Sequence, residues 1–502
     1  MGVLASLRPW IDRGGLAPSW FGGPWMKNLF CETLVPHRYT HFAVQRFRSA
    51  WPLGMAARAS GKPFPVRNSP RPAAAIPRRV RSPGSARCAP SPLFEQIAID
   101  LHQWYPDGVD EQTMDRAIEA DASVTLAWQH GRAYVVESAA SERRLEREPP
   151  FFRLEFAAYL LDMVALEEAG MVPSDGAAEL IVQVSDKTLN PTMSARDTPA
   201  IGRYNRKLNG NRSPSPEIRI PSWAFRMRNF DSAFLGTQMD RLVRQHPWEQ
   251  KAPVLFGRYT AYPAADPRLV RRNSSEMTRN TREYFVQHAA EWLPHGAFDL
   301  NLSSANRRPG SSTKKTEVNS AYMKVEMVAW PRSKYLLCLA GITWSGTCEM
   351  LMTMGSVPFV EQSGYATYFS SDLVPYEHFV PVWQDYPSDV TDAFAWAQSD
   401  DARARRVAER ARAFAARHLS LTARQCYWRE LISRLTREQP YFALAVVSGR
   451  RRLIPAREYL YGRVVKMMQQ ANSMIETQGG VGRCLMRCRD AQPGECTSPC
   501  MY

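Results

Sequence analysis

The sequence of 502 residues contains no apolar run that approaches the roughly 18 residues of a membrane-spanning helix, so none is expected. It also lacks the glycine-lysine loop of P-loop NTPases and the Gly-x-Gly-x-x-Gly fingerprint of dinucleotide-binding folds. Neither a His-Glu-x-x-His motif nor an Asp-x-Asp pair occurs. These absences exclude or disfavour a P-loop ATPase, a dinucleotide-dependent enzyme and a zinc peptidase.

Acidic side chains are almost missing from residues 1–93, which hold 14 of the 64 Lys and Arg residues but only Asp12 and Glu32. The formal charge of +15 at pH 7 therefore belongs mostly to this arm, and the rest of the chain is close to neutral. A near-neutral body is not typical of an enzyme that reads nucleic acid, so no nucleic-acid partner is expected. An association through the arm remains an alternative, and its binding would be strongly salt-dependent.

Hydrophobic periodicity is also missing from the arm, which is rich in Arg, Pro and Ser and is expected to be disordered. Its composition fits an organelle transit peptide, a disordered leader or an incorrectly assigned start equally well. A very short apolar stretch and no basic segment follow Met1, unlike a clear signal peptide.

The nine cysteines form no obvious disulfide framework. Four of them lie in the tail, in two Cys-x-x-x-Cys pairs: Cys484, Cys488, Cys496 and Cys500. Zinc ribbons prefer two intervening residues, so disulfides or an unpaired flexible tail fit this spacing better than a metal site.

The rest of the sequence is that of a soluble globular protein, with 44% apolar and 23% charged residues and room for two or three domains. Two short extended runs meet at His130-Gly131 and predict a hairpin. The next helix is predicted to end at Gly170. An apolar strand then ends at Ser185-Asp186, which puts a carboxylate at its carboxyl end.

From residue 335 the chain alternates between strand and helix patterns. The predicted order is strand 335–340, helix 345–354, strand 356–360, helix 365–371, strand 378–383 and a long helical segment over 388–418. Such alternation indicates a parallel sheet, in which ligands bind at the carboxyl ends of the strands. We expect two α/β domains facing a cleft, lined by Asp186 on one side and by residues 341–347, here named the corner, on the other.

The corner combines small residues and hydroxyls where a strand gives way to a helix. Gly341 and Gly346 allow close approach of the backbone, and Ser345 and Thr347 offer hydroxyl donors beside the helix N-terminus, a combination that suits a phosphate group. An ordinary helix cap would use the same residue types. A hydrolase nucleophile at Ser345 is disfavoured, because the nucleophile elbow needs glycines where Thr343 and Thr347 stand.

Two other candidate residues have structural alternatives of their own. Asp186 could act at the cleft or simply cap the turn after its strand. His378 precedes an apolar strand and is more typical of a structural histidine than of a catalytic one.

Residues 334–432 resemble the C-terminal half of glycosyltransferase family 90, the Rumi-like protein O-glucosyltransferases and fungal capsule xylosyltransferases. The resemblance is carried by the order and spacing of several short pieces: Lys334-Tyr335-Leu336, Gly341 with Trp344-Ser345, Gly355-Ser356, Leu373-Val374-Pro375, His378-Phe379-Val380-Pro381-Val382, Asp385 and Cys426-Tyr427-Trp428. Upstream, Pro221-Ser222-Trp223-Ala224-Phe225 resembles a Pro-x-Trp-x-Phe element of the family, and the whole likeness extends over about 95–435.

The resemblance implies a GT-B fold and an inverting transfer of glucose or xylose from a UDP-sugar to a hydroxyl of a protein or glycan. Asp186 is similar to the family's catalytic base. The resemblance assigns the departing UDP to Arg258, Thr260, Gly341, Trp344, Ser345, Gly346 and Thr347. It places Trp223 and Phe225 on the acceptor side or in the pocket. Trp344 could equally be an aromatic residue of the core. Without an Asp-x-Asp pair no obligatory metal or other cofactor is expected.

The sequence departs from the family at several of these positions. The Phe-Arg-Gly-Ser-Arg element of the family is here Phe256-Gly257-Arg258-Tyr259-Thr260, with Gly and Arg exchanged. Where many members have a further donor-binding arginine, an ungapped alignment gives Ala265, and Arg268 could replace it only with a shift. Thr347 stands where Rumi-like members have arginine. A catalytically degenerate relative that binds a glycan or partner is therefore the alternative to an active transferase.

The resemblance also implies a domain division and a location. We expect a leader over 1–93, an acceptor-side α/β domain over 94–250, a nucleotide-sugar-binding α/β domain over 251–435, and a helical extension with the cysteine tail over 436–502. Family members work in the lumen of the endoplasmic reticulum or Golgi, so the same location is expected here.

Overall fold

The computed structural model describes residues 88, 91–119, 124–147, 150–184, 198–208, 216–228, 230–235, 237–260, 281–303, 325–464 and 466. Its helices are α4 (Leu93–Leu101), α5 (Glu111–Glu119), α6 (Ala139–Arg147), α7 (Pro150–Glu168), α8 (Ala224–Met227), α9 (Phe230–Ala233), α10 (Thr237–Gln245), α12 (Thr281–Trp292), α13 (Thr347–Leu351), α14 (Val390–Ser399), α15 (Asp401–His418), α16 (Leu421–Glu438), α17 (Phe442–Val447) and α18 (Ala456–Tyr459). Its strands are β1 (Thr125–Gln129), β2 (Arg132–Val136), β3 (Ala177–Val182), β4 (Ile201–Arg203), β5 (Arg206–Lys207), β6 (Ile218–Arg219), β7 (Ala252–Thr260), β8 (Phe298–Ser303), β9 (Ser333–Cys338), β10 (Val357–Glu361), β11 (Tyr365–Ala366), β12 (Val380–Val382) and β13 (Leu453–Pro455). The predicted α/β class is confirmed.

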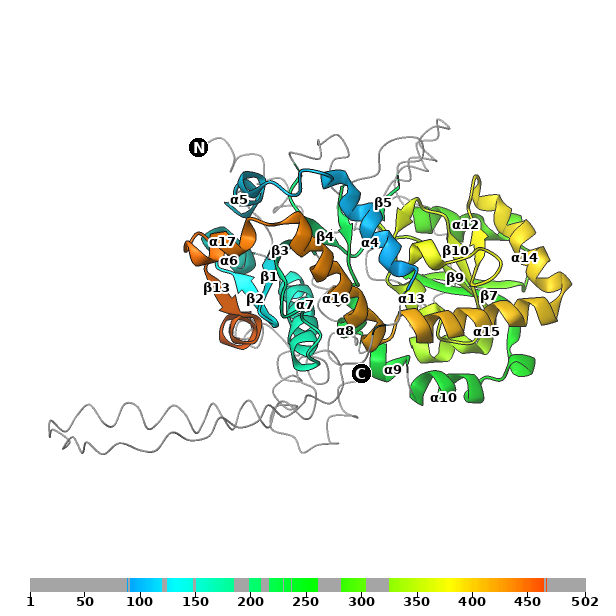
Figure 1. The fold of residues 1–502 in the computed structure, drawn as a ribbon. Helices are drawn as coiled ribbons and strands as arrows, with labels where there is room; N and C mark the ends of the chain where they lie inside the picture. The colour runs from blue at the N-terminus through cyan, green and yellow to red at the C-terminus, as the bar shows by residue number, and fades with distance from the viewer. Residues whose placement is uncertain are drawn as a thin grey trace, which may run out of the picture.

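Two larger sheets lie side by side, each covered by helices (Figure 1). The six-stranded sheet has the order β13-β2-β1-β3-β4-β6, and α7 and α16 lie beside it on the left of the view. The five-stranded sheet has the order β12-β10-β9-β7-β8, with α12, α14 and α15 around it on the right. We call the parts built around these sheets the first half and the second half.

The second sheet is parallel throughout its described pairings, as the alternation of strand and helix predicted. The first sheet is mixed. Its β3, β4 and β6 are parallel, whereas β1, β2, β3 and β13 pair antiparallel, so it is only partly of the expected parallel type. The chain returns to this sheet after the second half, because β13 pairs with β2.

Local sequence explains several of these elements. The β1–β2 hairpin turns at His130 and Gly131, and both have positive φ, the geometry of a type I′ turn. Helix α7 is terminated by Gly170, two residues after its last helical residue, whose φ of 64° closes a Schellman motif in which Met171 N–H donates to the carbonyl of Leu166 at 3.0 Å. The predicted turn and helix end are both confirmed.

The expected helix over 365–371 is wrong. Gly364, with φ of 76°, turns the chain into β11, where Tyr365 pairs with Lys207 of β5, and only a short 3-10 turn follows over Ser370–Asp372. A strand of two residues is too short to show an alternation of apolar and polar residues, so pairing with β5 in the first half decides its conformation. The long helical segment is divided in two at Asp400, whose side chain accepts from Arg403 N–H and caps α15.

Two disulfides occur among the described residues, although the spacing of the cysteines suggested no framework. Cys88 is bonded to Cys426 of α16, 338 residues later, and Cys338 to Cys348, 10 residues later. The tail cysteines lie outside the described residues.

Buried charge ties α4 to the first sheet. Asp100 is fully buried and accepts from Arg206 Nη1 at 2.7 Å and from Arg219 Nη2 at 2.8 Å.

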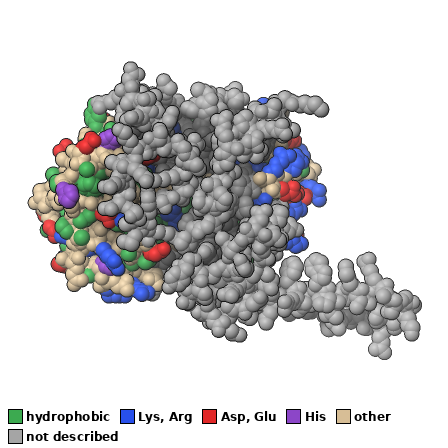
Figure 2. All heavy atoms as spheres, turned by 180° about the vertical axis from the view of Figure 1, so that it is seen from behind, with side chains coloured by type: hydrophobic (Ala, Val, Ile, Leu, Met, Phe, Trp, Pro, Cys, Tyr) green, Lys and Arg blue, Asp and Glu red, His purple; other side chains and the backbone are tan. Residues whose placement is uncertain are grey.

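On the face seen in Figure 2, described side chains of both charge signs are interspersed. No described helix is long and apolar enough to cross a membrane.

Candidate functional site

The corner follows β9 and lies where the two halves meet. β7 and β9 are parallel neighbours, so Thr260 and Cys338 end at the same edge of the sheet. The hydrophobic cluster of the first half includes Trp344 of the corner and Cys348 and Leu351 of α13. The carboxyl edge of the second sheet therefore faces the first half, as expected for a ligand site in a parallel sheet.

The corner is held from both sides. Tyr204 of the first half places its hydroxyl 2.9 Å from Thr343 Oγ1, and Asn205 Nδ2 donates to the same oxygen at 3.2 Å. Within the corner Gly341 N–H donates to the Thr343 carbonyl at 2.9 Å. The Cys338–Cys348 disulfide closes the loop at its base.

A cavity of about 200 Å³ opens at this edge. Its wall includes all seven predicted donor-binding residues and Trp223: Arg258, Thr260, Gly341, Trp344, Ser345, Gly346, Thr347 and Trp223. Trp344 is 8% exposed and also packs edge-on against Phe369, so it is both a wall residue and a core aromatic.

Phe225 is not among the described lining residues. It is buried, stacks edge-on with Phe230 at 4.9 Å between ring centroids and lies under the Arg424 guanidinium. Asp186 lies outside the described residues. Glu155 of α7, which the sequence did not single out, is the acidic residue among the described lining residues and is 1% exposed.

Arg282 backs the corner from the second half. It lies in the first turn of α12, is 8% exposed and donates to the main-chain carbonyls of Ala340, Leu339 and Thr260 at 2.9–3.1 Å. Its Nη2 also lies 3.3 Å from Ser345 Oγ. The family resemblance places a further donor-binding arginine close behind β7. Arg282 comes later in the chain, after residues 261–280, so the spacing of the motif alone could not reveal Arg282.

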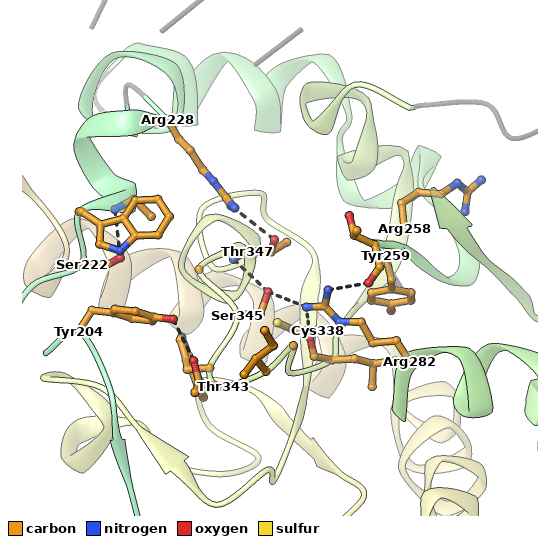
Figure 3. A pocket seen from close by; sticks show the side chains of 18 of the residues that line it. Tyr204, Ser222, Arg228, Arg258, Tyr259, Arg282, Cys338, Thr343, Ser345 and Thr347 are labelled. Atoms are coloured by element: carbon orange, nitrogen blue, oxygen red, sulfur yellow. Dashed lines mark hydrogen bonds between the residues drawn. The ribbon is translucent and has the colours of Figure 1, made fainter. Parts of the chain in front are cut away.

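Arg228 reaches the corner from the other side (Figure 3). It caps the C-terminus of α8, and its Nη1 lies 3.4 Å from Thr347 Oγ1 and 3.5 Å from Met350 Sδ. Its position, three residues after the Pro221–Phe225 element, was the available sequence signal. Arg228 and Arg282 thus flank Thr347 and Ser345, which are themselves joined by a 3.4 Å contact from Thr347 N to Ser345 Oγ.

Arg258 is directed elsewhere. It forms an ion pair with Asp299 of β8 at 2.8 Å and donates to the carbonyl of the same residue at 2.8 Å, and its guanidinium points away from the corner in Figure 3. The exchange of Gly and Arg has a steric reason. A Cβ on Gly257 would lie 2.0 Å from the Tyr259 hydroxyl, which donates to the Leu337 carbonyl at 2.9 Å.

The helix behind the corner is shorter than expected. The sequence predicted a helix over 345–354, but α13 covers only Thr347–Leu351, so the contribution of its dipole to anion binding is small. The arginines carry most of the positive charge at the site. Glu349 of α13 is 2% exposed, and burial raises its pKa to about 7, against the opposing effect of the nearby Arg228 charge.

The arrangement suits an anion with several oxygens. Two guanidinium groups, two hydroxyls and the backbone of two glycines line one side of a cavity. Charge-assisted hydrogen bonds to phosphate are the interactions such groups form best. Among the described residues no group of three or more His, Cys, Asp or Glu side chains is placed to hold a metal ion.

Comparisons with known proteins agree with the resemblance found in the sequence. The family model "Glycosyl transferase family 90" matches residues 85–488. "Protein O-glucosyltransferase 1" of Rattus norvegicus is 25% identical over 203 residues, covering 40% of this chain and 46% of that protein. The protein of the same name from Homo sapiens is 29% identical over 130 residues, covering 26% and 33%. The chain thus aligns with less than half the length of these two relatives.

Proposed function

Because the chain belongs to glycosyl transferase family 90, we propose that it transfers glucose or xylose from a UDP-sugar to a hydroxyl of a protein or glycan, with inversion at the sugar carbon. The observation that carries the proposal is the corner at the carboxyl edge of the second sheet. Seven residues expected at the donor line one cavity there, and of these only Arg258 directs its side chain away, to Asp299. A GT-B arrangement, with the first half facing the acceptor, accords with the two sheets on either side of it.

Asp186 is proposed as the base. Its carboxylate would take the proton of the acceptor hydroxyl while that oxygen forms a bond to C1 of the sugar. The bond from C1 to the β-phosphate oxygen breaks, and UDP leaves with the electron pair. A positioned base of this kind contributes typically about 10²–10⁴-fold to the rate.

The leaving diphosphate gains negative charge, which the corner is suited to stabilise. Ser345 and Thr347 offer hydroxyls and backbone N–H groups, and Arg282 is buried and fixed by three carbonyls before any ligand arrives. Such preorganised donors stabilise a transition state without reorganisation. The proposal needs no obligatory metal, because arginines take over the neutralisation of phosphate charge.

The relatives' name favours glucose and a protein acceptor, with xylose as the second donor to test. The lumen of the endoplasmic reticulum or Golgi is proposed as the location. Two disulfides among the described residues suit an oxidising compartment.

The test is UDP release by the full chain from UDP-glucose and UDP-xylose, with peptides and simple glycans as acceptors, in the presence and absence of EDTA. The full chain is needed because Cys88 is bonded to Cys426. Asp186→Asn is the test variant, and Glu155→Gln is its control, since Glu155 supplies the other candidate carboxylate.

EDTA-resistant turnover that falls about 10²–10⁴-fold in Asp186→Asn but persists in Glu155→Gln is the expected result. The reverse pattern would move the role of base to Glu155. Nucleotide-dependent stabilisation without turnover on any acceptor would favour the degenerate binding protein. A protein that neither turns over nor binds UDP would refute the proposal.

A further inference from the structure

We propose that Arg228 is a diphosphate-binding residue of this site and supplies from the first half a cation that the corner itself lacks; the role rests on the proposed function. The ligand is the diphosphate of a nucleotide sugar. Neither the family match nor the names of the relatives assigns a role to this residue.

The first argument is position. Arg228 lines the cavity, and its guanidinium approaches the corner from the side opposite Arg282 (Figure 3). Ser345 and Thr347 lie between the two arginines, in contact with Arg282 Nη2 at 3.3 Å and Arg228 Nη1 at 3.4 Å respectively. A diphosphate placed over these hydroxyls would therefore meet a guanidinium on each side.

The second argument is the nature of the contacts. The Arg228 contacts with Thr347 and Met350 measure 3.4 and 3.5 Å, at the long end of the hydrogen-bond range. A charged phosphate oxygen forms shorter and stronger bonds with a guanidinium than a hydroxyl or a thioether does. Arg282 donates to three carbonyls, which fixes its position on the other side of the two hydroxyls.

The third argument is charge. Three arginines stand among the described lining residues, and one of them, Arg258, is paired with Asp299 at 2.8 Å. Among the described lining residues, Arg282 would be the one guanidinium left to face the charges of a diphosphate if Arg228 did not contribute.

The test compares the affinity of the full chain for UDP, UMP and uridine by calorimetry. Arg228→Gln is the main variant, and Arg244→Gln, an exposed arginine on the neighbouring α10, is the matched control. Because Arg228 already touches Thr347, a second variant, Arg228→Gln with Thr347→Arg, returns a guanidinium to the same wall from the opposite segment. Melting temperatures without ligand check that each variant is folded.

We expect Arg228→Gln to weaken UDP binding roughly 10- to 100-fold, the effect of losing a charge-assisted hydrogen bond. Uridine affinity and the control should stay close to wild type, and the double variant should regain part of the UDP affinity. An unchanged UDP affinity in Arg228→Gln, or an equal loss for UDP and uridine, would overturn the role of Arg228 while leaving the proposed function standing. If the wild type binds UDP no better than uridine, the proposed function fails, and this inference with it.

Discussion

The Cys338–Cys348 disulfide offers a quantitative test of how the corner is held. Both sulfurs are buried, and the bond closes a loop with a sequence separation of 10. The loop-entropy relation gives about 2.7 kcal/mol of stabilisation at 25 °C for a loop of this length. The variant Cys338→Ala with Cys348→Ala should lose about this free energy of unfolding.

Urea unfolding with a fluorescence readout measures the loss as a shift of the midpoint at an unchanged slope. Each single substitution also breaks the bond, so either one should cost nearly as much as both together, a strong departure from additivity. The freed corner should also bind UDP more weakly. A loss well below 1 kcal/mol, or single effects that add up to the double effect, would refute the reasoning.

Three further predictions concern buried groups. Glu349 has a pKa of about 7 in the folded protein, above its ordinary value of 4.5, so the folded state holds a proton that the unfolded state releases between these values. The free energy of unfolding should therefore fall as the pH rises from 4.5 to 7, by on the order of 3 kcal/mol, and urea unfolding at pH 5 and 8 should show no such fall in Glu349→Gln. Asp100→Asn leaves Arg206 and Arg219 without their buried anion and should cost roughly 3–5 kcal/mol in the same assay; a loss under 1 kcal/mol would mean that water or another group replaces it. Gly257→Ala should displace the Tyr259 ring and cost about 1–3 kcal/mol, and a melting temperature equal to that of wild type would contradict the contact.

Patterns within one segment predicted much of the site. The apolar run before the corner, the small residues after it and the regular alternation beyond them are local features, so the sequence alone indicated a parallel sheet with a ligand site at its carboxyl edge. The order of short motifs over 334–432 indicated the family, and the match over 85–488 confirms it. The catalytic role of Asp186 stays a prediction, because that residue lies outside the described part of the chain.

Tertiary structure alone decided which cations reach the corner. Arg282 and Arg228 are 63 and 119 residues away in sequence from the hydroxyls they contact, and a pattern within one segment cannot predict contacts over such separations. The family resemblance assigned Arg258 to the donor, and Arg258 does line the cavity, but its guanidinium is paired with Asp299 of β8. The sequence by itself indicated the strand before the corner and the small residues that follow it, because these depend on local propensity, although β9 ends at Cys338, two residues before the predicted end. Which side chains surround that place depends on packing between distant segments, and only the folded chain determines it.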